Sequence, residues 1–267
     1  MVLYIFIQGL LLRSALIPFG IALKFKEWFG LLTITLFGNY FIPAAGLGAR
    51  AIYLNKVHHM DITSFSVSVS AIYLIELFVF GIGGAVGLAL ATDLARYDVV
   101  VIFSGFVVGS IILLFLLISS FRFPWEDKKI FRLANAVLDS WECCRSHKRS
   151  MLLLFVYTLL EFLLYSLLFF YSFEFLASAI SPEESFVYSA ISDFSFFIKF
   201  TPAGVGTYET SILYAGNILG DPFDIALAVT ALIRLVTIAV LIILTPVMAV
   251  ILFKEIREQD SSAKQSI

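Results

Sequence analysis

The chain has 267 residues, of which 60% are hydrophobic and only 14% are charged, and its mean hydropathy is +0.97. Soluble domains have roughly 45–50% apolar and 25% charged residues, so this composition excludes a soluble enzyme and indicates an integral membrane protein. A formal net charge of -2 provides no basic field for nucleic acid. The only two cysteines, Cys143 and Cys144, are adjacent and define no disulfide framework.

Long apolar stretches predict five membrane-spanning helices, in the order 2–23, 62–90, 99–119, 151–180 and 223–253. Two shorter stretches, 28–42 and 185–201, each run into a loop that contains Pro and Gly. A helix of about 15 residues covers about 23 Å, which is less than the roughly 30 Å of a bilayer core. The two shorter stretches are therefore predicted to be helices that break inside the membrane.

The densest basic segment, at residues 121–150, predicts the orientation of the chain. Loops rich in Lys and Arg stay in the cytoplasm, so this segment should be cytoplasmic. If both short stretches crossed fully, Lys24, Lys26 and the basic tail would be exported. Two re-entrant hairpins avoid this, the first entering from the cytoplasm and the second from outside. We then expect a multi-pass protein of the cell membrane with its N-terminus outside and its C-terminus in the cytoplasm.

The predicted organisation is one transmembrane domain, residues 1–253, followed by a polar cytoplasmic tail, 254–267. Within the domain, a first repeat at about 28–90 and a second at about 185–253 flank the basic segment. Apolar residues recur at helical spacing from Trp125 to Trp141, which predicts an amphipathic helix on the inner leaflet or packed on other cytoplasmic loops. Cys143, Cys144 and His147 lack the spacing of a metal site.

The two halves share one plan at a constant offset. It aligns Gly46 with Gly204, Gly48 with Gly206, Phe65 with Phe223 and Glu76 with Arg234. Each half has a short helix, a Pro and a G-x-G turn, then a second short helix with one charge and a long span with another. The sign of both charges is reversed between the halves. With opposite entry into the membrane, this plan predicts an inverted-topology repeat whose broken helices form a substrate site near the midplane.

Ionisable residues inside spans cost about 2.5–3.5 kcal/mol each, so those present indicate pairing or function. They are Arg50, Glu76, Glu161, Asp193, Lys199, Glu209 and Arg234, and Asn39 is a further polar residue at the first break. The repeat predicts the pairs Arg50–Glu209 and Glu76–Arg234, and we expect Asp193 or Lys199 to reach Glu161. Two interpretations fit: structural ion pairs between the halves, or a polar cavity for a phosphate or lipid headgroup. Glycine breaks expose backbone N–H groups that suit anions, and Arg binds phosphate with a planar fork.

Several of these residues together resemble the membrane domain of the lysylphosphatidylglycerol synthase family, over residues 11–253. They are Asn39, Pro43-x-x-Gly46-x-Gly48-x-Arg50, Glu76, Pro202-x-Gly204-x-Gly206-x-x-Glu209 and Arg234. In that family the domain is regarded as a lipid flippase module with two inverted repeats and re-entrant segments. The resemblance implies functional roles for Arg50 and Glu209, supported by Glu76 and Arg234. Only residues 254–267 follow the spans here, so no synthase activity is expected.

The expected function is therefore movement of a phospholipid or lipid-linked headgroup between leaflets. The alternative is a non-transporting scaffold that presents lipid to a separate membrane glycosyltransferase or lipid-modifying enzyme. The sequence contains no H-E-x-x-H and no nucleophile elbow, so we expect neither enzyme activity nor a cofactor or metal. Membrane lipids are the expected partners.

Overall fold

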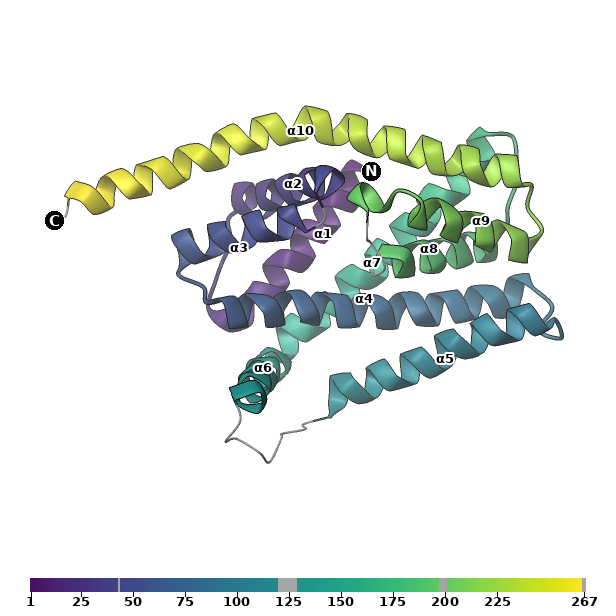
Figure 1. Ribbon diagram of the computed structural model, residues 1–267, viewed down its shortest axis with the longest axis horizontal. Coiled ribbons are helices and arrows are strands. Elements are labelled where there is room, and N and C mark those ends of the chain that lie inside the picture. Colours follow the sequence, from purple (N-terminus) through teal and green to yellow (C-terminus); the bar gives the residue numbers. More distant parts are fainter. Residues whose placement is uncertain (43, 120–128, 197–200, 266–267) are drawn as a thin grey trace.

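The computed structural model describes residues 1–42, 44–119, 129–196 and 201–265, and this part of the chain is helical without strands, as predicted (Figure 1). The helices are α1 (Val2–Leu16), α2 (Phe25–Phe41), α3 (Ala45–His58), α4 (Ile62–Ala91), α5 (Tyr97–Ile118), α6 (Lys129–Ser146), α7 (Lys148–Phe175), α8 (Pro182–Phe196), α9 (Thr207–Leu219) and α10 (Phe223–Gln265). Two 3₁₀ turns, η1 (Ile17–Phe19) and η2 (Pro202–Gly204), follow α1 and precede α9.

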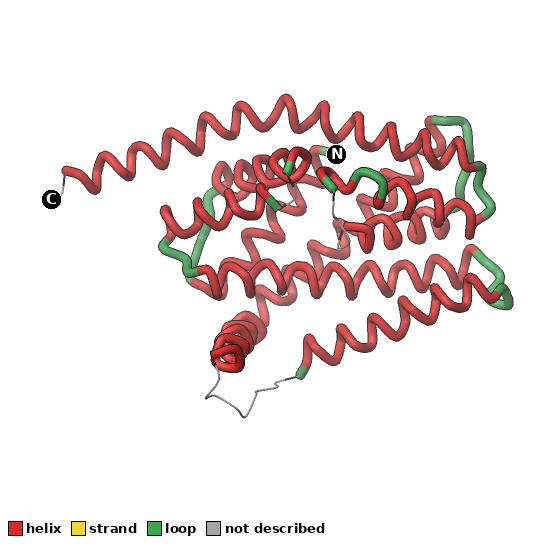
Figure 2. The backbone as a smooth tube through the Cα atoms, in the orientation of Figure 1, coloured by secondary structure: helices red, strands yellow, loops and turns green. Residues whose placement is uncertain are grey.

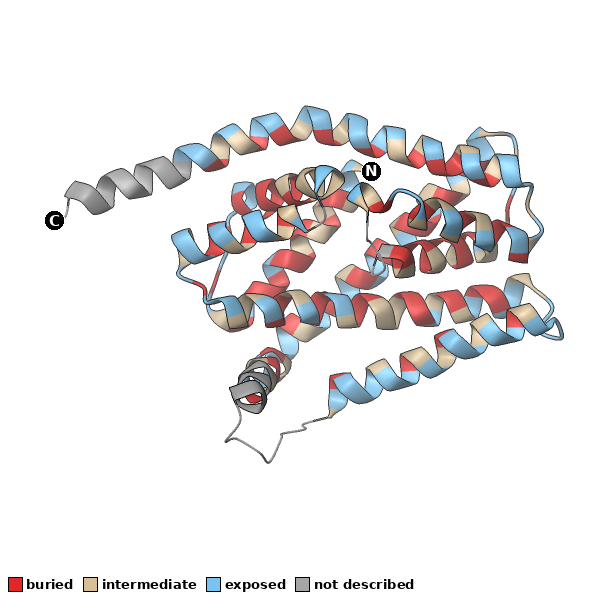
Figure 3. Ribbon diagram, in the orientation of Figure 1, coloured by how far each residue is buried: buried red, intermediate tan, exposed pale blue. Residues whose placement is uncertain are grey.

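Five of these helices are long and apolar enough to span a membrane. They are α1 with η1, α4, α5, α7 and α10 up to Lys254. This confirms the five apolar spans expected from the sequence. Helix α5 packs on α4 and leaves most of its other side chains exposed (Figure 3), including Phe115 and Ile118. An apolar surface of this extent is suited to lipid contact.

Helices α2 and α3 form a hairpin that returns to the end from which it starts. The chain is extended at Ile42 and left-handed at Ala44, where φ is 61°, while Pro43 lies outside the described residues. At the open end, Oε1 of Glu27 in the first turn of α2 lies 2.9 Å from Nε2 of His58 in the last turn of α3. The first and last turns of this hairpin are therefore neighbours.

Helices α8 and α9 form the second hairpin. Its tip contains η2 and Gly206, whose φ of 91° is a conformation that favours glycine. Helix α9 ends at Leu219, and Gly220 caps it, also with positive φ. Beyond it, Asp221 accepts a hydrogen bond of 2.7 Å from the Tyr188 hydroxyl on α8. This bond joins the middle of α8 to the segment that follows α9.

The two hairpins point toward each other from opposite ends of the bundle (Figures 1 and 2). The α2–α3 hairpin opens where α4 begins, and the α8–α9 hairpin opens where α10 begins. Their tips meet in the middle of the bundle, where η2 contacts α2. Helices α4 and α10, which follow the hairpins, run in opposite directions.

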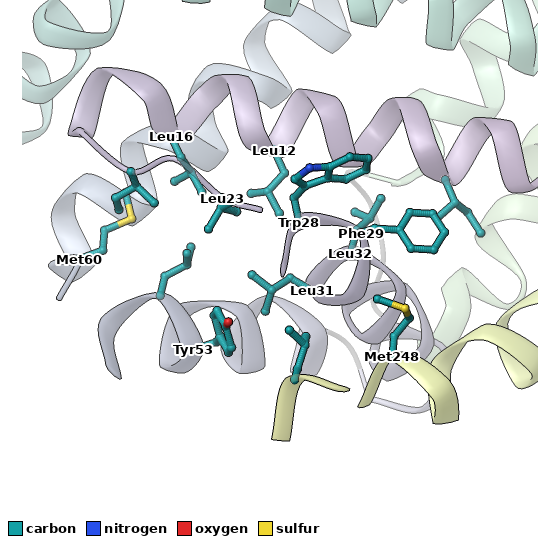
Figure 4. Packing of buried hydrophobic residues seen from close by; sticks show 14 of the residues in the cluster. Leu12, Leu16, Leu23, Trp28, Phe29, Leu31, Leu32, Tyr53, Met60 and Met248 are labelled. Carbon is teal, nitrogen blue, oxygen red and sulfur yellow. The ribbon is translucent and has the colours of Figure 1, made fainter. Parts of the chain in front are cut away.

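Each hairpin has its own apolar core. The first is built from α1, α2, α3 and α10, with Leu12, Trp28, Tyr53 and Met248 among its members (Figure 4). The second joins α7, α8, α9 and α10 around rings such as Phe169 and Tyr188. Both cores include side chains of α10, so this helix packs against the two hairpins.

Helix α6 lies within the basic segment. Its Trp141 and Cys144 are buried in a cluster with side chains of α1, α4 and α7, and burial raises the pKa of the Cys144 thiol to about 11. Trp125 lies outside the described residues. Because α6 packs against α4, α7 and η1, the part of it that the structure describes is attached to the bundle.

Candidate functional site

A cavity of about 460 Å³ lies where the two hairpin tips meet. Helices α1, α2, α3, α4, α7, α8, α9 and α10 all contribute to its wall. Its polar and charged lining consists of Tyr4, Gln8, Thr35, Asn39, Tyr40, Arg50, Tyr73, Glu76, Tyr165, Asp193, Thr201, Tyr208, Arg234 and Thr237. The volume falls within the range of small-molecule pockets, so the cavity is large enough for a headgroup.

Arg50 on α3 is the cationic side chain of the first hairpin at this cavity, and it is 7% exposed. Its Nε donates to Oγ1 of Thr35 over 3.2 Å, and that hydroxyl in turn donates to the carbonyl of Leu31. Among the described residues no carboxylate lies within ion-pair distance of Arg50. The two terminal amino groups of the guanidinium are therefore available to a ligand, in the fork that binds a phosphate or carboxylate.

Arg234 on α10 has several partners already. Its Nε lies 2.6 Å from Oε1 of Glu209, with the N–H bond not aligned on the oxygen, so the contact is an ion pair. One terminal nitrogen donates to the carbonyl of Gly204 over 3.3 Å, and the guanidinium lies 5.1 Å from the centre of the Tyr208 ring. Arg234 thus joins α10 to the tip of the second hairpin and is largely neutralised there.

The expected cross-repeat pairs Arg50–Glu209 and Glu76–Arg234 are not formed. Glu209 is the third residue of α9, and its Oε2 accepts a hydrogen bond of 2.7 Å from the Gly206 amide. This cap fixes the side chain beside its own hairpin, and its other oxygen reaches Arg234 of the same half. The pairing prediction was wrong because it overlooked this local constraint.

Glu76 on α4 lines the cavity together with Arg50. No hydrogen bond or ion pair joins it to a described residue, although its charge interacts with those of Arg50, Asp193 and Glu161. Each half therefore places its own two charges in one region: a contact pair in the second half, and a looser pair, Arg50 with Glu76, in the first.

The glycines of the two breaks shape the hairpins, and none of them lines the cavity. A Cβ on Gly46 would lie 2.0 Å from the carbonyl oxygen of Thr35, so α2 and α3 approach closely only because this residue is glycine. The Gly46 amide donates to Oδ1 of Asn39 over 2.9 Å. A Cβ on Gly48 would meet nothing within 4 Å. In the second hairpin Gly204 and Gly206 have positive φ.

The remaining predicted polar residues separate into three cases. Asn39 and Asp193 line the cavity. Glu161 on α7 lies outside the lining, is 2% exposed, and accepts a hydrogen bond of 2.7 Å from Nε2 of Gln8. Lys199 lies outside the described residues. No group of three potential metal ligands occurs in the part of the chain that the structure describes.

Apart from Asn39, the uncharged polar side chains of the cavity wall were not predicted from the sequence. Gln8 and Tyr4 come from α1, and the Tyr4 ring stacks on that of Tyr165 at 5.3 Å between centroids. The hydroxyls of Tyr165 and Tyr208 are 3.2 Å apart. Gln8 could have been found, because an amide inside an apolar span requires a partner just as a charge does.

Comparison with protein families gives a match over most of the chain. The model described as the lysylphosphatidylglycerol synthase TM region matches residues 1–245. The chain belongs to this family. Family membership agrees with the resemblance of the two Pro-Gly breaks, and it associates the chain with a membrane domain concerned with lipid. Neither the search of curated proteins nor the search of solved structures gives a match.

Proposed function

We propose that this protein binds an anionic lipid headgroup in the central cavity and moves the lipid, or a lipid-linked headgroup, between leaflets. The proposal depends on the position and the contacts of Arg50. Its guanidinium is buried, lines the cavity, and has Thr35 as its hydrogen-bond partner among the described residues. A buried cation with a free fork gains two charge-assisted hydrogen bonds when a phosphate enters.

The hairpins give the proposed membrane geometry. Each is shorter than a full span and returns to its own end, so we infer that both are re-entrant and related as an inverted repeat. The cavity at their tips then lies near the bilayer midplane. Its volume admits a headgroup while the acyl chains stay in lipid.

Charge supports the proposed orientation. The open end of α2–α3 carries Lys24 and Lys56, the start of α7 carries Lys148 and Arg149, and the basic segment adjoins them. The opposite end carries mostly acids: Asp93, Asp98, Glu183, Glu184, Asp221 and Asp224. By the positive-inside rule the basic end faces the cytoplasm. The C-terminus, which lies at this end, is then also cytoplasmic, and the protein lies in the cell membrane.

The proposal is tested by a leaflet-resolved assay on the purified protein in vesicles, with labelled anionic, zwitterionic and glycosylated lipids. We expect the protein to accelerate exchange of the anionic class, and Arg50→Lys to lose most of that effect. Arg13→Lys is the matched control, because Arg13 is exposed and outside the cavity lining. Binding without exchange would favour the scaffold that presents lipid to another enzyme. Absence of both binding and exchange would contradict the proposal.

A further inference from the structure

A buried carboxyl and a buried amide meet behind the cavity wall. Nε2 of Gln8 on α1 donates to Oε1 of Glu161 on α7 over 2.7 Å, and to the Tyr4 hydroxyl over 2.9 Å. The other oxygen of each group, Oε1 of Gln8 and Oε2 of Glu161, is buried and has no hydrogen-bond partner. Two side chains joined by one hydrogen bond thus leave two acceptors unsatisfied.

One proton resolves both deficits. A carboxyl group protonated at Oε2 becomes a donor, and the group it then faces in an acid–amide pair is the carbonyl of the same amide. The pair would then exchange two hydrogen bonds, Gln8 to Glu161 and Glu161 to Gln8. An ionised Glu161 would instead keep an unsatisfied oxygen and a buried negative charge.

Among the described residues no cation pairs with the Glu161 carboxylate, and its hydrogen-bond donor is the neutral amide of Gln8. No ion pair joins Glu161 to a described residue, and its side chain is 2% exposed. An isolated ionised carboxylate in such a place is costly, and the usual outcome is that the group takes up a proton.

In the part of the chain that the structure describes, the groups closest to Glu161 are neutral or acidic. Helix α1 contributes Tyr4 and Gln8, α4 contributes Glu76, and α8 contributes Asp193. Tyr165 follows one turn later on α7 itself. Of the other helices packed on α7, α10 brings Arg234, which is held by Glu209, and α6 meets α7 near the Lys148 end.

We propose that Glu161 binds a proton. Gln8 positions the carboxyl group by a hydrogen bond, and Gln8 and Tyr4, whose side chains line the cavity, connect Glu161 to the cavity. The proton would neutralise the acidic side of the cavity when an anionic headgroup occupies Arg50, and its exchange would couple headgroup movement to pH. The coupling rests on the proposed lipid function, whereas the proton site itself does not.

Infrared spectroscopy of the purified protein in lipid vesicles tests the site at neutral pH without lipid transport. We expect a carbonyl stretch of a protonated carboxylic acid that disappears in Glu161→Gln and persists in Glu174→Gln, the exposed acid on the same helix. The amide introduced by Glu161→Gln can pair with the amide of Gln8, so this variant should remain folded. In Gln8→Leu the band should move to higher frequency, because the carbonyl loses its hydrogen bond.

Absence of the band in the wild-type protein, or a band that survives in Glu161→Gln, would overturn the proton site. A second outcome would also overturn the proton site. If the infrared band is absent and sodium chloride, but not choline chloride, stabilises the wild type against unfolding, Glu161 belongs to a cation site. A positive infrared result combined with no lipid exchange at any pH would leave the proton site standing and count against the proposed function alone.

Discussion

Glu209 and Arg234 form an ion pair, with 2.6 Å between Nε of Arg234 and Oε1 of Glu209, that joins the start of α9 to the first third of α10. Glu209 has two roles at once, since its second oxygen caps the Gly206 amide. The Arg234 side chain is 16% and the Glu209 side chain 24% exposed, so solvent screens the pair only partly. This relationship holds the tip of the second hairpin beside the cavity.

Replacement of Glu209 by Gln should weaken the fold while leaving the cap in place. The amide oxygen can still accept from Gly206, but the guanidinium of Arg234 loses its counter-charge, and we expect a loss of about 1–3 kcal/mol in the free energy of unfolding. Denaturant titration in detergent micelles measures this. Adding Arg234→Gln to Glu209→Gln should recover part of the loss, since no uncompensated charge remains. A Glu209→Gln protein as stable as the wild type would show that the pair contributes nothing.

The two glycines of the first break should respond differently to alanine. In Gly46→Ala the new methyl would lie 2.0 Å from a backbone oxygen of α2, so the hairpin cannot close and folded yield should fall sharply. Gly48→Ala meets nothing within 4 Å and replaces a helical glycine, so its stability should be unchanged or higher by about 0.5–1 kcal/mol. Size-exclusion profiles and melting temperatures of the two variants distinguish these outcomes. Equal behaviour of both variants would contradict the close approach at Gly46.

Helix α4 begins with a cap whose effect depends on pH. The Asp61 carboxylate accepts hydrogen bonds from the amide and hydroxyl of Ser64, at 2.9 and 2.6 Å, and these bonds lower its pKa. Because the folded pKa is the lower one, this stabilisation is present above the unfolded pKa of about 3.9 and is lost as pH falls through the folded pKa.

Asp61→Ala should therefore reduce stability by about 1 kcal/mol at neutral pH, and by less in acid. Asp61→Asn keeps a capping oxygen and should remove most of the pH dependence. Thermal unfolding followed between neutral pH and pH values below about 4 checks both variants. A gap between wild type and Asp61→Ala that stays constant over this range would show that the carboxylate charge is irrelevant.

The spans and the breaks could be predicted from the sequence because both are local. A run of apolar residues has to be a helix in lipid, and Pro and Gly interrupt it. The partners of Arg50 and Arg234 could not be predicted in the same way. Glu209 caps the Gly206 amide and pairs with Arg234 of its own half, and this placement depends on the side-chain geometry at the hairpin tip. The wall formed by Gln8 and Tyr4 depends on how α1 packs against α7, which no local pattern specifies.

Labelling of single cysteines from either side of the membrane tests the re-entrant geometry. In a background with Cys143 and Cys144 replaced by Ser, cysteines at Lys24 and Lys56 should react from the cytoplasmic side. Cysteines at Glu183 and Asp224 should react from the outer side. If Lys24 and Lys56 were accessible from opposite sides, α2 and α3 would not form a re-entrant hairpin.

Binding of an anionic headgroup by Arg50 in the cavity is tested by measuring lipid affinity of the purified protein. The affinity for an anionic phospholipid is compared between wild type, Arg50→Lys and Arg13→Lys, with a zwitterionic lipid as reference. We predict that Arg50→Lys weakens anionic binding about tenfold or more despite its charge, because the planar fork is lost, while Arg13→Lys binds as the wild type does. Equal affinity of the wild type and Arg50→Lys, in a folded protein, would contradict the account.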